Sequence, residues 1–160
     1  MVSRPASLDA AASLDAGNPP ERDRQTDGRA SRSPDEAMRL RGIRGATTVS
    51  ANTREAILDA TLELLTAIID ANGVRREDVA SVFFSATPDL NADFPAVAAR
   101  EHMGWTDIAL MCGHEMDVPG SLSMCLRILM HVNTPKAASE LKFVYLRGAE
   151  ALRRDLVADD

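Results

Sequence analysis

The sequence has few of the residues that build metal, disulfide or nucleic-acid sites. Its 160 residues include two cysteines and three histidines. Cys112 and Cys125 form no Cys-x-x-Cys pair, and no two histidines have the i, i+4 spacing of a helical zinc site. The formal net charge is -6, and nothing in the sequence indicates the clustered basic surface that a phosphate backbone requires. We therefore expect two reduced thiols, no metal, and no nucleic-acid partner.

Long apolar runs are absent as well. A helix that crosses a membrane needs about 20 consecutive apolar residues, and no stretch approaches this length. The first residues also lack the basic start and the apolar stretch of a secretory signal. We expect a cytoplasmic protein that does not bind a membrane.

The first 37 residues differ in composition from the rest. Residues 1–37 contain no aromatic side chain, only three large apolar ones after Met1, and half of the eight prolines. Such a segment cannot bury enough apolar surface to offset the entropy lost on ordering. We predict a disordered extension over 1–37 and one folded domain over 38–160. Met38 is also a candidate for the true start of the protein, and a native intact mass that includes 1–37 would refute that idea.

The remaining residues alternate between the periods of a strand and of a helix. Asn52 and Glu55 resemble a capping box at the start of a helix, and Gly73 is typical of its end. The pattern predicts strands over 40–49, 79–85, 108–112 and 142–146, the last continuing toward Leu152, and helices over 53–71, from Pro95 to before Gly104, and over 121–132.

The predicted order β-α-β-α-β-α-β indicates an α+β (α/β-like) domain, a mixed sheet with helices on one face. Residues 121–132 are apolar on nearly every side of a helix. That pattern suggests burial against another subunit.

Four residues need an explanation, and each has a structural and a functional one. Arg127 interrupts the apolar run CLRILM, so its charge must reach solvent, pair with a carboxylate, or face a polar cavity. Glu115 follows a predicted strand, where it is either a ligand-binding carboxylate or a loop charge. Arg44 lies beside glycines that permit close approach of a ligand or serve only a bulge. Tyr145 alternates with Phe143 and fits a core, an interface or a site.

Six short runs surround these positions. They are RGIRGATTV (41–49), SATPDLNADFPA (85–96), Gly104-Trp105, EMDVPGSL (115–122), CLR (125–127), and VYL followed by LR (144–153). In order and spacing these runs resemble the AroH-type monofunctional chorismate mutases over essentially all of 38–156. The resemblance implies a [3,3] rearrangement of chorismate to prephenate in phenylalanine and tyrosine biosynthesis, with no cofactor. It also implies a homotrimer with a pseudo-α/β barrel core and with active sites at the subunit interfaces.

The resemblance assigns a role to each matching residue. Arg127 would donate hydrogen bonds to the ether oxygen of the breaking bond and to a carboxylate. Arg44 and Tyr145 would hold substrate carboxylate, while Glu115 and Cys112 would meet the ring hydroxyl. Arg127, Glu115 and Arg44 form the predicted catalytic set. The other predicted substrate-binding residues are pocket walls, neighbours of the cysteine and further cations: Phe94, Leu152, Met111, Gly113, His114, Arg100, and Arg153 from a tail that closes over the ligand.

Two positions depart from the family pattern. Val97 lies where family members carry a lysine, and Met111 lies where they carry a smaller polar residue. The resemblance places both positions at the edge of the pocket, so we expect the departures to bear on substrate affinity and not on the chemistry.

Two other functions are compatible with a trimeric pocket. The first is a non-catalytic binding or regulatory protein for a small organic anion. Retention of Arg44, Glu115, Arg127 and Tyr145 together argues against it, because a decayed site loses charged members first. The second is an enamine/imine deaminase of the RidA type, whose characteristic sequence runs are absent.

Overall fold

The computed structural model describes residues 37–156, with side chains as far as Leu152. The disorder predicted for the N-terminal extension and the role predicted for the Arg153 side chain lie outside these residues. None of the helices described is long and apolar enough to cross a membrane. The elements are β1 (Arg39–Thr48), α1 (Arg54–Asn72), η2 (Arg76–Asp78), β2 (Val79–Ala86), α2 (Ala96–Met103), β3 (Ala109–His114), β4 (Cys125–Thr134), η3 (Ala138–Glu140), β5 (Val144–Tyr145) and η4 (Arg147–Leu156), the η elements being 3₁₀ helices.

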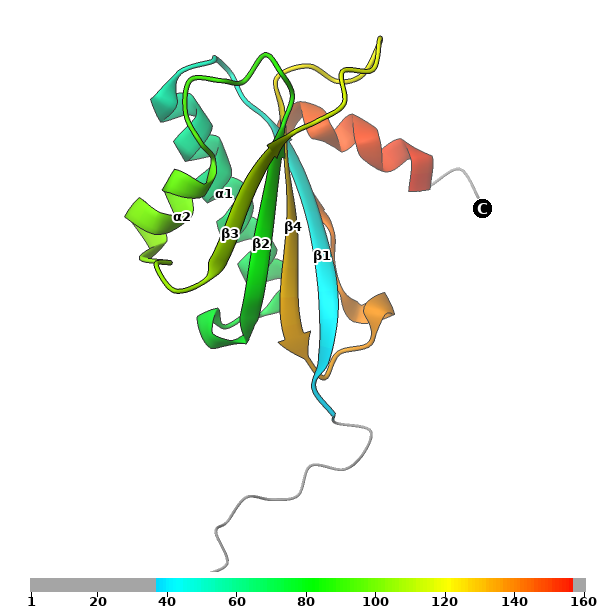
Figure 1. Cartoon of the computed structure of the whole chain (residues 1–160). Coiled ribbons are helices and arrows are strands. Elements are labelled where there is room, and N and C mark those ends of the chain that lie inside the picture. The colour runs from blue at the N-terminus through cyan, green and yellow to red at the C-terminus, as the bar shows by residue number, and fades with distance from the viewer. Residues whose placement is uncertain (1–36, 157–160) are drawn as a thin grey trace, which may run out of the picture. The chain divides into compact units, whose positions relative to one another are not determined.

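The five strands form one mixed sheet in the order β3-β2-β4-β1-β5. Strand β4 lies at the centre and runs antiparallel to both β1 and β2. The outer pairs, β2 with β3 and β1 with β5, are parallel. Helices α1 and α2 lie on one side of this sheet (Figure 1). The predicted α+β class and mixed sheet are therefore confirmed.

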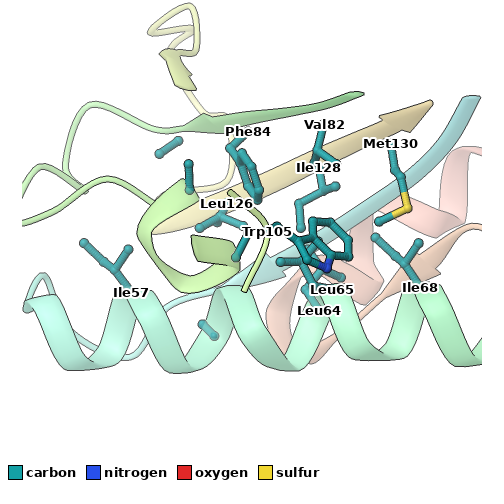
Figure 2. Packing of buried hydrophobic residues seen from close by; sticks show 14 of the residues in the cluster. Ile57, Leu64, Leu65, Ile68, Val82, Phe84, Trp105, Leu126, Ile128 and Met130 are labelled. Atoms are coloured by element: carbon teal, nitrogen blue, oxygen red, sulfur yellow. The ribbon is translucent and has the colours of Figure 1, made fainter. Parts of the chain in front are cut away.

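Helix α1 supplies most of the core on its side of the sheet. Its apolar residues recur at helical spacing, so they form one buried stripe. Figure 2 shows Leu64, Leu65 and Ile68 directed toward strand residues such as Ile128 and Met130. The helix is capped by Thr53, whose Oγ1 accepts from the backbone N of Ala56 at 3.2 Å. The cap predicted at Asn52 is wrong by one residue, while Gly73 ends the helix with φ 62°, as expected.

The helix predicted over 121–132 is wrong, because the structure places strand β4 there. Alternate residues Leu126, Ile128, Met130 and Val132 are buried beneath the helices. The residues between them are half-buried on the other face. A central strand with apolar residues on both faces has little period-two contrast, so it resembles an apolar helix in sequence. The corrected order is β-α-β-α-β-β-β.

The last predicted strand is much shorter than expected. Strand β5 contains Val144 and Tyr145, and the Leu146 backbone N still donates to the Ala46 carbonyl at 2.9 Å. Arg147 then adopts φ 54°, which turns the chain out of the sheet and into η4. The extension of this strand toward Leu152 is therefore wrong.

Candidate active site

Two cavities contain most of the predicted site residues, and they are called the first and the second cavity below. The first cavity has a volume of about 430 Å³ and lies on the sheet face that α1 and α2 leave uncovered. Strand register explains its composition. Arg127 of β4 pairs with Ser85 of β2 on one side and with Ala46 of β1 on the other, and Ala46 pairs with Tyr145 of β5. Directly paired residues point to the same face of a sheet, so this row is shared by four strands. The cavity is lined by Arg44, Gly45, Ala46, Phe83, Ser85, Arg127, Ile128, Leu129, Tyr145 and Leu152.

An ion pair occupies the centre of this row. One oxygen of the Glu115 carboxylate binds the Arg127 guanidinium, and the other accepts a hydrogen bond from the Ser85 hydroxyl at 2.7 Å. The Glu115 side chain is 13% exposed and that of Arg127 is 31% exposed, so neither charge is fully solvated. The backbone N of Glu115 donates to the Ala86 carbonyl at 3.0 Å, which fixes the residue just beyond β3.

Two cations share the first cavity. Burial lowers the pKa of Arg127, and the positive charge of Arg44 lowers it further. An arginine remains protonated at neutral pH despite such effects. The cavity therefore presents two permanent cations, of which Arg127 is the more firmly oriented because Glu115 holds it.

The second cavity has a volume of about 300 Å³ and lies between the end of β3 and the loop that precedes α2. Burial raises the pKa of the Cys112 thiol, while the charge of Arg100 opposes that effect. Cys112 is thus a neutral thiol, suited to hydrogen bonding and not to nucleophilic attack. The cavity is lined by Ala86, Leu90, Asn91, Ala92, Asp93, Phe94, Pro95, Cys112, Gly113 and His114.

The loop that carries Phe94 is held from the start of α1. The Asn52 side-chain oxygen accepts from the backbone N of Asn91 at 3.0 Å and of Ala92 at 2.9 Å. Asp93 accepts from the backbone N of Phe94 at 2.6 Å. These contacts fix the loop backbone, while the Phe94 ring itself remains 67% exposed.

The predicted site residues are divided between the two cavities. Arg44, Arg127, Tyr145 and Leu152 line the first, and Glu115 joins it through its ion pair with Arg127. Four others line the second: Phe94, Cys112, Gly113 and His114.

Two predicted residues with described side chains line neither cavity. Met111 is 63% exposed on β3, and Arg100 is exposed on α2. Among the described residues, no cluster of histidine, cysteine or acidic side chains is arranged to hold a metal ion.

Sequence reasoning missed several residues that line the cavities. Among them are Phe83, Ser85 and Leu129 in the first and Asp93 in the second. The alternation of VASVFFSA places Phe83 and Ser85 on one face of β2, which is a usable signal. The partnership of Ser85 with Arg127 could not be found while residues 121–132 were interpreted as a helix.

The chain is similar to several known proteins. Residues 40–156 match the family model described as chorismate mutase type I. The chain is 48% identical over 119 residues to chorismate mutase AroH of Bacillus subtilis (strain 168), covering 74% of this chain and 94% of that protein. It is 46% identical over 118 residues to chorismate mutase AroH of Thermus thermophilus, covering 73% and 96%. A solved chorismate mutase from Clostridium thermocellum has a TM-score of 0.68 and 52% identity, covering 69% of this chain and 98% of that one.

The fold, the cationic cavity and these similarities together define an isomerase that acts on a small anionic substrate. The chain belongs to the type I, or AroH-type, chorismate mutase family. It converts chorismate to prephenate, a step of aromatic amino-acid biosynthesis.

Proposed function

We propose that Arg127 drives this rearrangement by stabilising negative charge on the ether oxygen of chorismate within the first cavity. The reaction is unimolecular and moves no proton, so it needs no general acid or base. In its transition state the C–O bond breaks ahead of C–C bond formation, which leaves the oxygen negative and the ring positive. A cation fixed beside that oxygen binds the transition state more tightly than the substrate, which is the condition for acceleration.

The single observation that carries this proposal is the orientation of the Arg127 guanidinium by Glu115. Because Ser85 donates to the second carboxylate oxygen of Glu115, the carboxylate is itself fixed. A guanidinium held in this way does not reorganise as charge develops on the substrate. Its planar fork can also contact the ether oxygen and a carboxylate at the same time, which a lysine cannot do.

The other polar residues of the first cavity position the substrate. Arg44 lies on the same sheet face as Arg127, and the resemblance assigns it, with Tyr145, to a substrate carboxylate. Glu115 would then accept a hydrogen bond from the ring hydroxyl while it keeps Arg127 in place. Holding the compact, reactive conformer of the substrate accounts for the part of the acceleration that electrostatics does not supply.

We propose further that the enzyme is a cytoplasmic homotrimer in which the first cavity of one subunit meets the second cavity of its neighbour. Support comes from the division of the predicted residues between two open cavities within one chain. The uncovered sheet face also exposes large apolar side chains, with Leu40 at 59%, Phe83 at 37% and Met111 at 63%. Apolar surface of this kind marks a contact with another subunit.

Loss of the diene absorbance of chorismate tests the role of Arg127. We expect the purified enzyme to form prephenate and Arg127→Ala to lose nearly all turnover while keeping the far-ultraviolet circular dichroism of the folded chain. An Arg127→Ala variant with near-normal kcat would refute electrostatic stabilisation by this residue.

Subunit mixing tests the shared site. Arg127→Ala removes a residue of the first cavity, and Arg100→Ala removes a cation beside the second. Assayed at a chorismate concentration far below KM, where each variant alone should turn over slowly, the two variants refolded together at equal amounts should restore roughly a quarter of the wild-type sites, because that share of interfaces pairs two intact halves. Sedimentation should give a trimer. No regain of activity in a mixed trimer would refute sharing, and a monomeric active enzyme would refute the assembly.

Cell fractionation tests the proposed location. Cys112 and Cys125 are both free thiols, as expected in a reducing compartment. Recovery of the enzyme outside the cytoplasmic fraction would contradict the proposal.

A further inference from the structure

A carboxylate in the wall of the second cavity conflicts with an anionic substrate. Asp93 lines this cavity, and its side chain is 17% exposed. Chorismate carries two carboxylates, so an uncompensated negative charge in the wall would repel it. The conflict arises only if the second cavity forms part of the substrate site, so the inference rests on the function proposed above.

Arg54 compensates this charge. Its guanidinium forms an ion pair with Asp93 and a second one, at 2.7 Å, with Glu101 of α2. Arg100 lies close enough to act on the same group, since its charge and that of Arg54 both help to keep the pKa of Asp93 low, after the larger effect of the Phe94 backbone N–H. The corner between α1 and α2 thus holds two cations and two carboxylates.

The position of Arg54 has no local explanation. It is the first residue of α1, where the helix dipole disfavours a cation and favours an acidic residue. The contacts that account for an arginine there are the two carboxylates of the neighbouring loop and helix.

We propose that Arg54 is a positioning residue that neutralises Asp93 and Glu101, leaving Arg100 free to attract the substrate carboxylate. Without Arg54 the corner has one cation and two carboxylates, and Arg100, whose charge already acts on Asp93, is the cation left to pair with it. The substrate would then face a negatively charged cavity wall, and Arg100 would pair with Asp93 instead of attracting the substrate carboxylate. Arg54 acts on substrate binding through other residues and touches neither the reacting atoms nor the ion pair of the first cavity.

Steady-state kinetics of Arg54→Gln test the proposal. In Arg54→Gln the charge of Asp93 is no longer compensated and lies several ångströms from the partly solvated chorismate dianion. We expect this repulsion to raise KM roughly threefold to tenfold. Because the charges that position the transition state remain, kcat should stay within about twofold of the wild type. Added salt should narrow the difference in KM, since screening weakens interactions at a partly exposed site.

A second substitution separates charge from loop anchoring. Asp93→Asn in the Arg54→Gln background removes the uncompensated charge of the cavity wall and leaves only that of Glu101, which lines neither cavity, so KM should return toward the wild-type value. If Arg54 served only to tie the loop that carries Asp93 to α1, the double variant Arg54→Gln/Asp93→Asn would hold the loop no better than Arg54→Gln alone. Its KM would then stay high. Arg76→Gln is the matched control, because it breaks a comparable ion pair with Asp107 that lines neither cavity, and its KM should not change.

An unchanged KM for Arg54→Gln, or a raised KM that Asp93→Asn does not lower, overturns the inference. Failure of the proposed function would give a different kinetic result. In that case the KM of Arg100→Ala, measured in parallel, would equal that of the wild type, which would show that the second cavity does not bind the substrate.

Discussion

Replacing Arg127 by lysine tests whether catalysis depends on the fork of the guanidinium or only on a positive charge. Arg127→Lys keeps a cation opposite Glu115, so the ion pair that crosses from β4 to the residue after β3 survives in weaker form. The planar arrangement of donors is lost, and with it the simultaneous contact to the ether oxygen and a carboxylate.

The magnitude follows from the geometry of the ion pair. Losing one preorganised hydrogen bond to developing charge costs about 3–4 kcal/mol of transition-state stabilisation, or roughly 10²–10³ in kcat. Glu115 still faces a cation, so the free energy of unfolding should fall by less than about 1 kcal/mol. In Arg127→Ala the same carboxylate loses its counter-ion while it is only 13% exposed, and about 1–3 kcal/mol of stability should be lost.

The assay is the initial rate of chorismate absorbance loss at saturating substrate, with urea unfolding monitored alongside. Arg41→Lys is the matched control, since Arg41 is also half-buried in the sheet but lines neither cavity, and its side chain donates to the Lys136 carbonyl at 3.3 Å. Its kcat should equal that of the wild type. An Arg127→Lys variant within about threefold of the wild-type kcat would refute the reasoning, because charge alone would then suffice.

Three further predictions concern stability. Gly45→Ala should lower the free energy of unfolding by about 1–3 kcal/mol, because the new methyl would lie 2.6 Å from Ile68 Cδ1. Gly42→Ala is the control and should be tolerated, because its new methyl would lie 3.4 Å from its nearest neighbour. Equal urea midpoints for the two variants would contradict this prediction. Burial raises the pKa of Cys125 to about 11. Above about pH 8.5 the unfolded thiol releases its proton while the folded one keeps it, so stability should fall with rising pH by up to about 1.4 kcal/mol per unit. Cys125→Ala should remove that slope, and an unaltered slope would assign it to other groups. Thr53→Ala should cost about 1 kcal/mol through loss of the α1 cap, and Thr53→Ser should retain it, both measured by urea unfolding.

Local patterns in the sequence were sufficient for the elements whose environment is one-sided. Helix α1 buries one face and exposes the other, so its helical period appears directly in the spacing of its apolar residues. Strand β2 and helix α2 are bounded by turn residues that end them within one or two positions of the prediction. The family resemblance, which the comparisons confirm, also depended on short runs of sequence alone.

Tertiary structure determined which residues of distant segments lie opposite one another in the folded chain. Strand β4 is covered by α1 on one face and lines a cavity on the other, so its residues carry no clear period, and only its pairing with β1 and β2 shows that it is extended. That pairing, together with that of β5 on β1, places Ser85 and Tyr145 in the row of Arg127. The fold also divides the predicted site between two cavities. The ion pair of Arg54 with Asp93, 39 residues apart, likewise exists only in the folded chain. The physical reason is that periodicity reports how one segment meets solvent, whereas register and long-range charge pairs depend on how distant segments pack together.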